Sequence, residues 1–226
     1  MEKKNNIRFL TLVLTLTAGY CDSLTFVAAN KTFSAHVTGN FIVFAYHIIL
    51  GADGEAWSSL LTFPTFILSV MIGGWIIEKF SKGHFLFFCE GIILLIGGAI
   101  AYLLDNTTNT EMTTAKYLVT MIAVLAMGLQ NAAGKSFTKE TYGPTTMMTG
   151  NVTQFALEIR SFLGSELKNK SLVPVVVKEL TTLGGFLIGC IIGAYFGHHF
   201  GLIGIVLPGI TMILIFFCRK YFSSNP

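Results

Sequence analysis

Charge is scarce in this chain: Asp, Glu, Lys and Arg together make up 12% of its 226 residues, and the mean hydropathy is +0.67. A soluble globular domain contains about twice that proportion of charged residues. The scarcity excludes an ordinary water-soluble fold and favours a membrane protein. The chain also lacks the HExxH, GxSxG, CxxC and phosphate-loop patterns of common enzyme families. We therefore expect no enzymatic activity, no cofactor and no bound metal.

Two further patterns are missing. The four cysteines, at positions 21, 89, 190 and 218, match no metal-binding or redox spacing, so they are interpreted as structural thiols. The basic residues stand singly beside apolar stretches and form no patch with interleaved aromatics. This excludes nucleic acid as a partner, and orientation in a lipid bilayer explains the same lysines and arginines.

What the chain has instead is long uncharged stretches. Residues 56–77, 117–134 and 180–218 contain no charge, and Glu90 alone interrupts residues 83–104. A helix needs roughly 20 apolar residues to cross the hydrocarbon of a bilayer. The last stretch is long enough for two crossings, with a natural break at residues 198–201. The sequence thus predicts an all-α, polytopic transmembrane helix bundle whose main partner is the lipid bilayer.

A short motif indicates an internal repeat. Thr-Gly-Asn occurs at residues 38–40 and again at 149–151, each time before an apolar run. A glycine-centred motif upstream (residues 18–22 and 127–131) and another downstream (residues 72–75 and 192–195) recur in the same order. We therefore predict one membrane domain made of two repeats, residues 1–110 and 111–226. Chance similarity between glycine-rich membrane segments is the alternative.

Charge placement selects a topology. If every apolar segment crossed the membrane, Lys79 and Lys82 would lie outside while Asp53 and Glu55 faced the cytoplasm, against the positive-inside tendency. The charges agree instead with about six net crossings, both termini in the cytoplasm and a location in the cell (cytoplasmic) membrane. Residues 9–50 and 117–163 then each form one crossing with a broken or re-entrant helix. Three crossings per repeat make the two repeats inverted.

Inverted repeats with broken helices occur in secondary transporters, where the breaks meet near the midplane and bind solute. Helix N-termini exposed at such breaks attract anions, which favours a polar or anionic small solute. Thr38 and Thr149 could each cap a helix that starts at the following glycine. In the alternative interpretation, these polar side chains only hydrogen-bond neighbouring helices. The candidate solute-binding residues are Asp22, Asn30, His36, Thr38, Gly39, Asn40, Gln130, Asn131, Thr149, Gly150 and Asn151.

Two carboxyl groups lie within apolar spans. Asp22 and Glu90 each place an ionisable group where a charge is costly, so they are candidates for carrying a coupling proton. Burial disfavours the charged form, so Glu90 is expected to be neutral when it is dehydrated. Asn131 occupies the position opposite Asp22 in the second repeat, which disfavours a symmetric two-proton scheme. Carboxyl groups that lie near the interface or are hydrogen-bonded within the bundle are the alternative.

These motifs are similar to those of a known family. Residues 19–23, 37–40, 128–133 and 148–151 resemble the YoaK-like family of bacterial multi-pass membrane proteins, classed as domain of unknown function family 1275. The resemblance spans nearly the whole chain. It implies a membrane fold and location, and it brings no substrate, cofactor or catalytic residue.

Two functions are consistent with the sequence. The first is a small secondary transporter or permease for a polar or anionic solute. The second is a membrane-embedded scaffold or sensor that binds a ligand without transporting it. Because a chain of 226 residues is short for enclosing a transport path, a homodimer is a candidate assembly.

Overall fold

The structure is a bundle of helices. A computed structural model describes residues 2–80, 84–104, 109–136, 141–142, 145–146, 148–164 and 173–218, and none of these residues forms a strand. This confirms the predicted all-α class. The elements are α1 (Glu2–Ala28), α2 (Gly39–Ile49), α3 (Asp53–Phe80), α4 (His84–Leu104), α5 (Asn109–Ser136), α6 (Met148–Gly164), α7 (Val173–Phe200), the 3-10 helix η1 (Gly201–Ile205) and α8 (Val206–Cys218).

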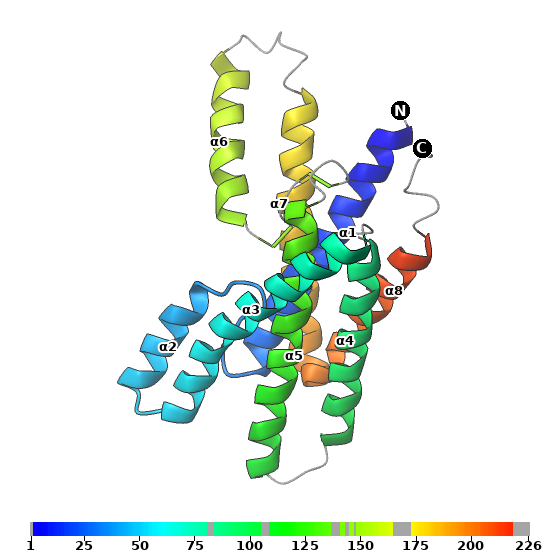
Figure 1. The fold of residues 1–226 in the computed structure, drawn as a ribbon. Coiled ribbons are helices and arrows are strands. Elements are labelled where there is room, and N and C mark those ends of the chain that lie inside the picture. Colours follow the sequence, from blue (N-terminus) through cyan, green and yellow to red (C-terminus); the bar gives the residue numbers. More distant parts are fainter. Residues whose placement is uncertain are drawn as a thin grey trace.

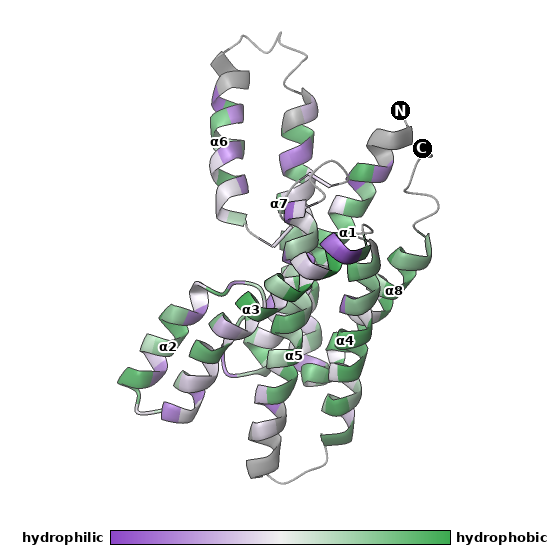
Figure 2. Cartoon of the chain, viewed as in Figure 1, coloured by the Kyte–Doolittle hydropathy of each residue, from purple (hydrophilic) through white to green (hydrophobic). Residues whose placement is uncertain are grey.

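Five helical segments are long and apolar enough to span a bilayer. Four of them coincide with α1, α3, α4 and α5, and the fifth, Val176–Cys218, contains α7, η1 and α8. The fifth folds into two helices at Gly201, whose φ of +57° favours glycine. Figure 2 shows hydrophobic residues along most of α3, α4 and α8, with more hydrophilic residues on α6. A polytopic membrane bundle is therefore confirmed.

The ends of α3 illustrate how the sequence places a helix in the membrane. Asp53 and Glu55 lie in its first turn and Lys79 in its last, an arrangement that the helix dipole favours. Between them only 17% of the apolar window is buried within the protein, against 67% for α1 and α5. Thus α3 presents most of its side chains to lipid, and α1 and α5 form the centre of the bundle.

Helices from opposite ends of the chain pack together. The main contacts join α1 with α7, α3 with α5, and α4 with both α5 and α8. Glycines permit the closest of these approaches. A Cβ on Gly193 of α7 would overlap the backbone of Tyr20 in α1, and a Cβ on Gly73 of α3 would lie 2.7 Å from the Cβ of Ala132 in α5.

The two shorter helices α2 and α6 extend from the bundle in opposite directions. Figure 1 shows α2 running from the middle of the molecule toward one end beside α3, and α6 running toward the other end beside α7. The start of α1 and the end of α8 lie at the same end (Figure 1). This is the arrangement that an even number of crossings requires.

Candidate functional site

The first break in the helices is held by Asp22. This residue lies in α1 and is 4% exposed. Its Oδ1 accepts hydrogen bonds from the backbone N–H groups of Ala35 (2.7 Å) and His36 (3.1 Å). Asn30 and Lys31 have φ values of +48° and +63°, so the chain reverses just after α1 and folds back along it. Asp22 therefore anchors residues 29–38, the segment that folds back along α1.

Asn40 anchors the far end of the same segment. Its Oδ1 accepts from the backbone N–H of Phe33 at 2.8 Å, and its Nδ2 donates to the Phe33 carbonyl at 2.8 Å and to Thr62 Oγ1 at 2.9 Å. The residue is fully buried. A buried amide with both ends satisfied specifies one geometry. Asn40 thus ties the break to α3.

The other predicted residues of the first break are more peripheral. The Asn30 carbonyl lies 3.1 Å from His47 Nε2 in α2, whereas the His36 and Thr38 side chains are exposed. Gly39 is buried, with the His36 ring 2.6 Å from where its Cβ would be. Helix α2 begins at Gly39, as predicted, but Thr38 makes no side-chain capping bond, so that part of the prediction is wrong.

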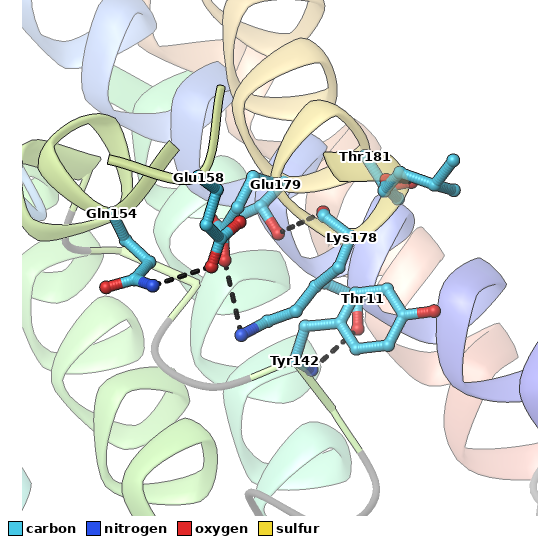
Figure 3. Close-up of polar contacts among 9 residues, drawn as sticks. Thr11, Tyr142, Gln154, Glu158, Lys178, Glu179 and Thr181 are labelled. Atoms are coloured by element: carbon cyan, nitrogen blue, oxygen red, sulfur yellow. Dashed lines mark hydrogen bonds and ion pairs between the residues drawn. The ribbon is translucent and has the colours of Figure 1, made fainter. Parts of the chain in front are cut away.

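The second break lies between the end of α5 at Ser136 and the start of α6 at Met148. Gln130 is fully buried, and its Nε2 donates to the Leu14 carbonyl (2.7 Å) and to Thr145 Oγ1 (2.8 Å). The backbone N–H of Tyr142 donates to Thr11 Oγ1 at 3.0 Å (Figure 3). The described parts of this break are thus tied to α1.

The predicted residues around the second motif are not gathered with Gln130. Thr149 lies inside α6, so the expectation that it caps this helix is wrong. Its side chain and Gly150 are exposed, and Asn131 and Asn151 are half-buried.

The two breaks contact α1 at different positions along its helix axis. The first contacts Asp22, and the second contacts the Leu14 carbonyl through Gln130. Eight residues of α-helix separate these positions, which is a distance of about 12 Å along the axis. The described parts of the two breaks thus contact α1 at separate positions, and the shared solute site stays a prediction.

Glu90 is a buried carboxyl group in the middle of an apolar helix. It lies in α4, is fully buried, and neither of its carboxyl oxygens has a hydrogen-bond partner among the described residues. Next to it, Gly91 brings α4 against α8, because a Cβ there would lie 2.9 Å from the Gly209 carbonyl oxygen.

A recess of about 300 Å³ opens where several helices end. Its charged or titratable lining residues are Lys116 from α5 and His198 from α7, and none of the described residues that line it is acidic. A small anion is the ligand that this charge favours. No group of three His, Cys, Asp or Glu residues that could hold a metal ion occurs in the described part of the chain.

Comparison with known proteins gives a family. Residues 10–218 match the family model described as protein of unknown function, DUF1275. The chain belongs to this family. No curated protein and no solved structure matches it.

One buried carboxyl group of this DUF1275 member was not predicted from the sequence. Glu179 of α7 is 2% exposed, although the sequence placed it only at the edge of an uncharged stretch. Figure 3 shows it together with Glu158 of α6. Three valines at positions 175–177 precede it, and this apolar context was the available signal.

Proposed function

We propose that this protein is a small proton-coupled secondary transporter for a polar or anionic solute, and that its role is transport and not catalysis. The observation that carries the proposal is Glu90, whose two carboxyl oxygens are buried without a partner among the described residues. An isolated ionisable group inside a membrane bundle is costly, and such groups commonly belong to proton or ion pathways. We assign Glu90 as the proton carrier, and Asp22 as a second candidate that also anchors the first break.

The proposal includes two inverted repeats. In support, Gly19 of α1 contacts the Phe186 carbonyl of α7, and Gly128 of α5 contacts the Phe66 carbonyl of α3. Gly128 follows Gly19 by 109 positions, and Phe186 follows Phe66 by 120. The same offsets relate the contact between Gly193 and Tyr20 to the one between Gly73 and Leu129.

The opposite directions of α2 and α6 also support inversion (Figure 1). In this arrangement each repeat contributes one re-entrant element, and each element approaches from its own side of the membrane. The two can then alternate in exposing a path, as repeats do in transporters of this architecture.

We further propose that the solute enters beside Lys116 and His198. The recess volume of about 300 Å³ is suited to a small molecule, and the Lys116 ammonium in its lining favours an anion. With α1 starting on the cytoplasmic side, as the positive-inside tendency favours, this recess faces outward.

Cysteine labelling in intact cells tests the orientation. Single cysteines at Gly54 and His199, which are both exposed, should react with a membrane-impermeant reagent, and one at Lys79 should not. The reverse pattern would contradict the assignment of a cytoplasmic N-terminus.

Proton coupling is tested in proteoliposomes that contain a pH-sensitive dye. Phosphate, sulfate and small dicarboxylates are added outside, and the internal pH is followed. We expect at least one anion to drive acidification, and Glu90→Gln to lower its rate at least 10-fold because it removes the transferable proton. The control Asp53→Asn, at an exposed acid of α3, should leave the rate unchanged.

Two results would contradict the proposed proton-coupled transport through Glu90. Anion-dependent thermal stabilisation without any flux would favour the scaffold or sensor function. Full coupled flux in Glu90→Gln would eliminate Glu90 as the proton carrier.

A further inference from the structure

A pair of carboxyl groups joins α6 to α7. Gln154 Nε2 donates to Glu158 Oε1 at 2.6 Å, and Lys178 Nζ lies 3.2 Å from Glu179 Oε1. Each carboxyl therefore has one oxygen engaged. The other oxygen of each, Oε2, is buried and has no hydrogen-bond partner among the described residues. Two buried acceptors thus remain unsatisfied at one helix contact.

The two groups come from helices that pack against each other. Figure 3 shows the Glu158 and Glu179 side chains reaching into the same space between α6 and α7, with Lys178 beside them. Glu179 is 2% exposed. Leaving buried acceptors unpaired costs free energy, and two carboxylates that share a site do not both stay ionised.

We propose that Glu158 and Glu179 form a proton-binding site in which one proton is shared between their Oε2 atoms. The protonated carboxyl donates to the carboxylate, so one hydrogen bond satisfies both oxygens. The charge also balances, because two carboxylates and the Lys178 ammonium carry −1 and a single proton brings the cluster to zero. On release, the proton returns to water.

The number of free oxygens favours a proton over a metal ion. An alkali or alkaline-earth cation requires several oxygen ligands, typically six or more for calcium. Within the pair, only the two Oε2 atoms lack a hydrogen-bond partner among the described residues.

The other charged groups nearby do not occupy these oxygens. On α1, Arg8 Nε donates to Thr181 Oγ1 at 3.2 Å, two residues beyond Glu179. From the segment after α5, Tyr142 contributes its backbone N–H to Thr11. On α6, Arg160 is exposed, as is Lys135 near the end of α5. Among the described residues, Lys178 is therefore the cation counted with the pair.

Proton release would weaken the packing of α6 against α7. Helix α7 is the main packing partner of α6 among the described helices, so two adjacent carboxylates would repel at that contact. The pair thus couples proton binding to the position of the second re-entrant element. This inference needs no solute and stands whether or not the protein transports.

The test is thermal melting of the purified full-length protein in detergent between pH 5.5 and pH 8. We expect the fall in Tm from pH 5.5 to pH 8 to be about 4 °C larger in the wild type than in Glu158→Gln or Glu179→Gln. Loss of one hydrogen bond lowers Tm by an amount of this size in a chain of this length. In each variant the amide donates permanently to the remaining carboxylate, so the pH dependence of that contact is lost. Asp53→Asn is the matched control, and its Tm should fall with rising pH as much as that of the wild type.

A local readout separates this contact from other titrating groups. Spin labels at Val152 on α6 and Leu180 on α7, both exposed, report the distance between the helices in a cysteine-free background. The distance distribution should widen as the pH rises in the wild-type sequence and stay narrow in Glu158→Gln. Equal pH profiles of wild type and both variants, or unchanged distances, would overturn the proposal. Saturable stabilisation by sodium over choline at pH 8 would overturn it in favour of a metal ion.

Discussion

The two helix breaks follow the same order of motifs along the chain, but the protein holds them by different means. Residues 29–38 fold back on their own helix, where Asp22 accepts two backbone N–H groups and Asn40 makes three further bonds. The described part of the second break is bonded through Gln130 and Thr11. Thr11 belongs to α1, a helix of the other half of the chain.

This difference separates a fixed element from one that depends on its neighbours. The first break carries its own anchors, and α2 adds a bond from His47 to the Asn30 carbonyl. In the second, Gln130 has a satisfied amide NH₂ but an Oε1 without a partner among the described residues. We therefore expect the second break to move more readily than the first.

The largest expected effect is at the asparagine of the Thr-Gly-Asn motif. Asn40→Ala should lower the free energy of unfolding by about 3 kcal/mol, because three hydrogen bonds are lost and the partly buried Phe33 backbone loses its partner. In the second motif, Asn151→Ala should cost less than about 0.5 kcal/mol, since Asn151 is half-buried. Melting in detergent measures both, and equal losses would remove the distinction between the breaks.

A smaller effect is expected at the glycine contacts between the halves. Gly73→Ala should cost about 2 kcal/mol, because the new methyl group would lie 2.7 Å from the Cβ of Ala132 and α3 must shift away from α5. The adjacent Gly74→Ala is the matched control, with nothing within 4 Å of its Cβ position, and it should be neutral or slightly stabilising. A cost at Gly74 as large as at Gly73 would contradict this packing.

The smallest effect is expected at Gln130. Gln130→Leu removes two donated hydrogen bonds but also removes a buried oxygen without a partner, so the net loss should be about 1 kcal/mol. Chemical denaturation in mixed micelles can compare it with Asn40→Ala. A loss at Gln130 that matches Asn40→Ala would mean that the second break is anchored as firmly as the first.

The sequence predicted the helices well and the site less well. The long uncharged stretches located the spanning helices, and the Thr-Gly-Asn motifs located the starts of α2 and α6 to within two residues. Asp22, Asn40 and Gln130 were correctly expected near the breaks. The sequence did not show that the breaks contact α1 about 12 Å apart, or that Thr38 leaves its capping position unused.

Glu179 shows why the burial of some polar groups could not be predicted from the sequence. It follows Lys178 directly, and a charged pair near the end of an apolar stretch is usually solvated at the membrane interface. Packing of α6 against α7 buries its carboxyl group instead. No local sequence pattern indicates that α6 packs against α7 beside Glu179.

The sequence by itself indicated the membrane environment, the positions of the long apolar helices and the places where the chain breaks. These are local properties, because hydrocarbon thickness sets helix length and the backbone must satisfy its own hydrogen bonds. Only the tertiary structure decided which polar groups are buried and what they contact. Those contacts join distant residues, as Gln130 does when it donates to the Leu14 carbonyl 116 positions away. Two identical Thr-Gly-Asn motifs can therefore differ in burial, because their neighbours come from different parts of the chain.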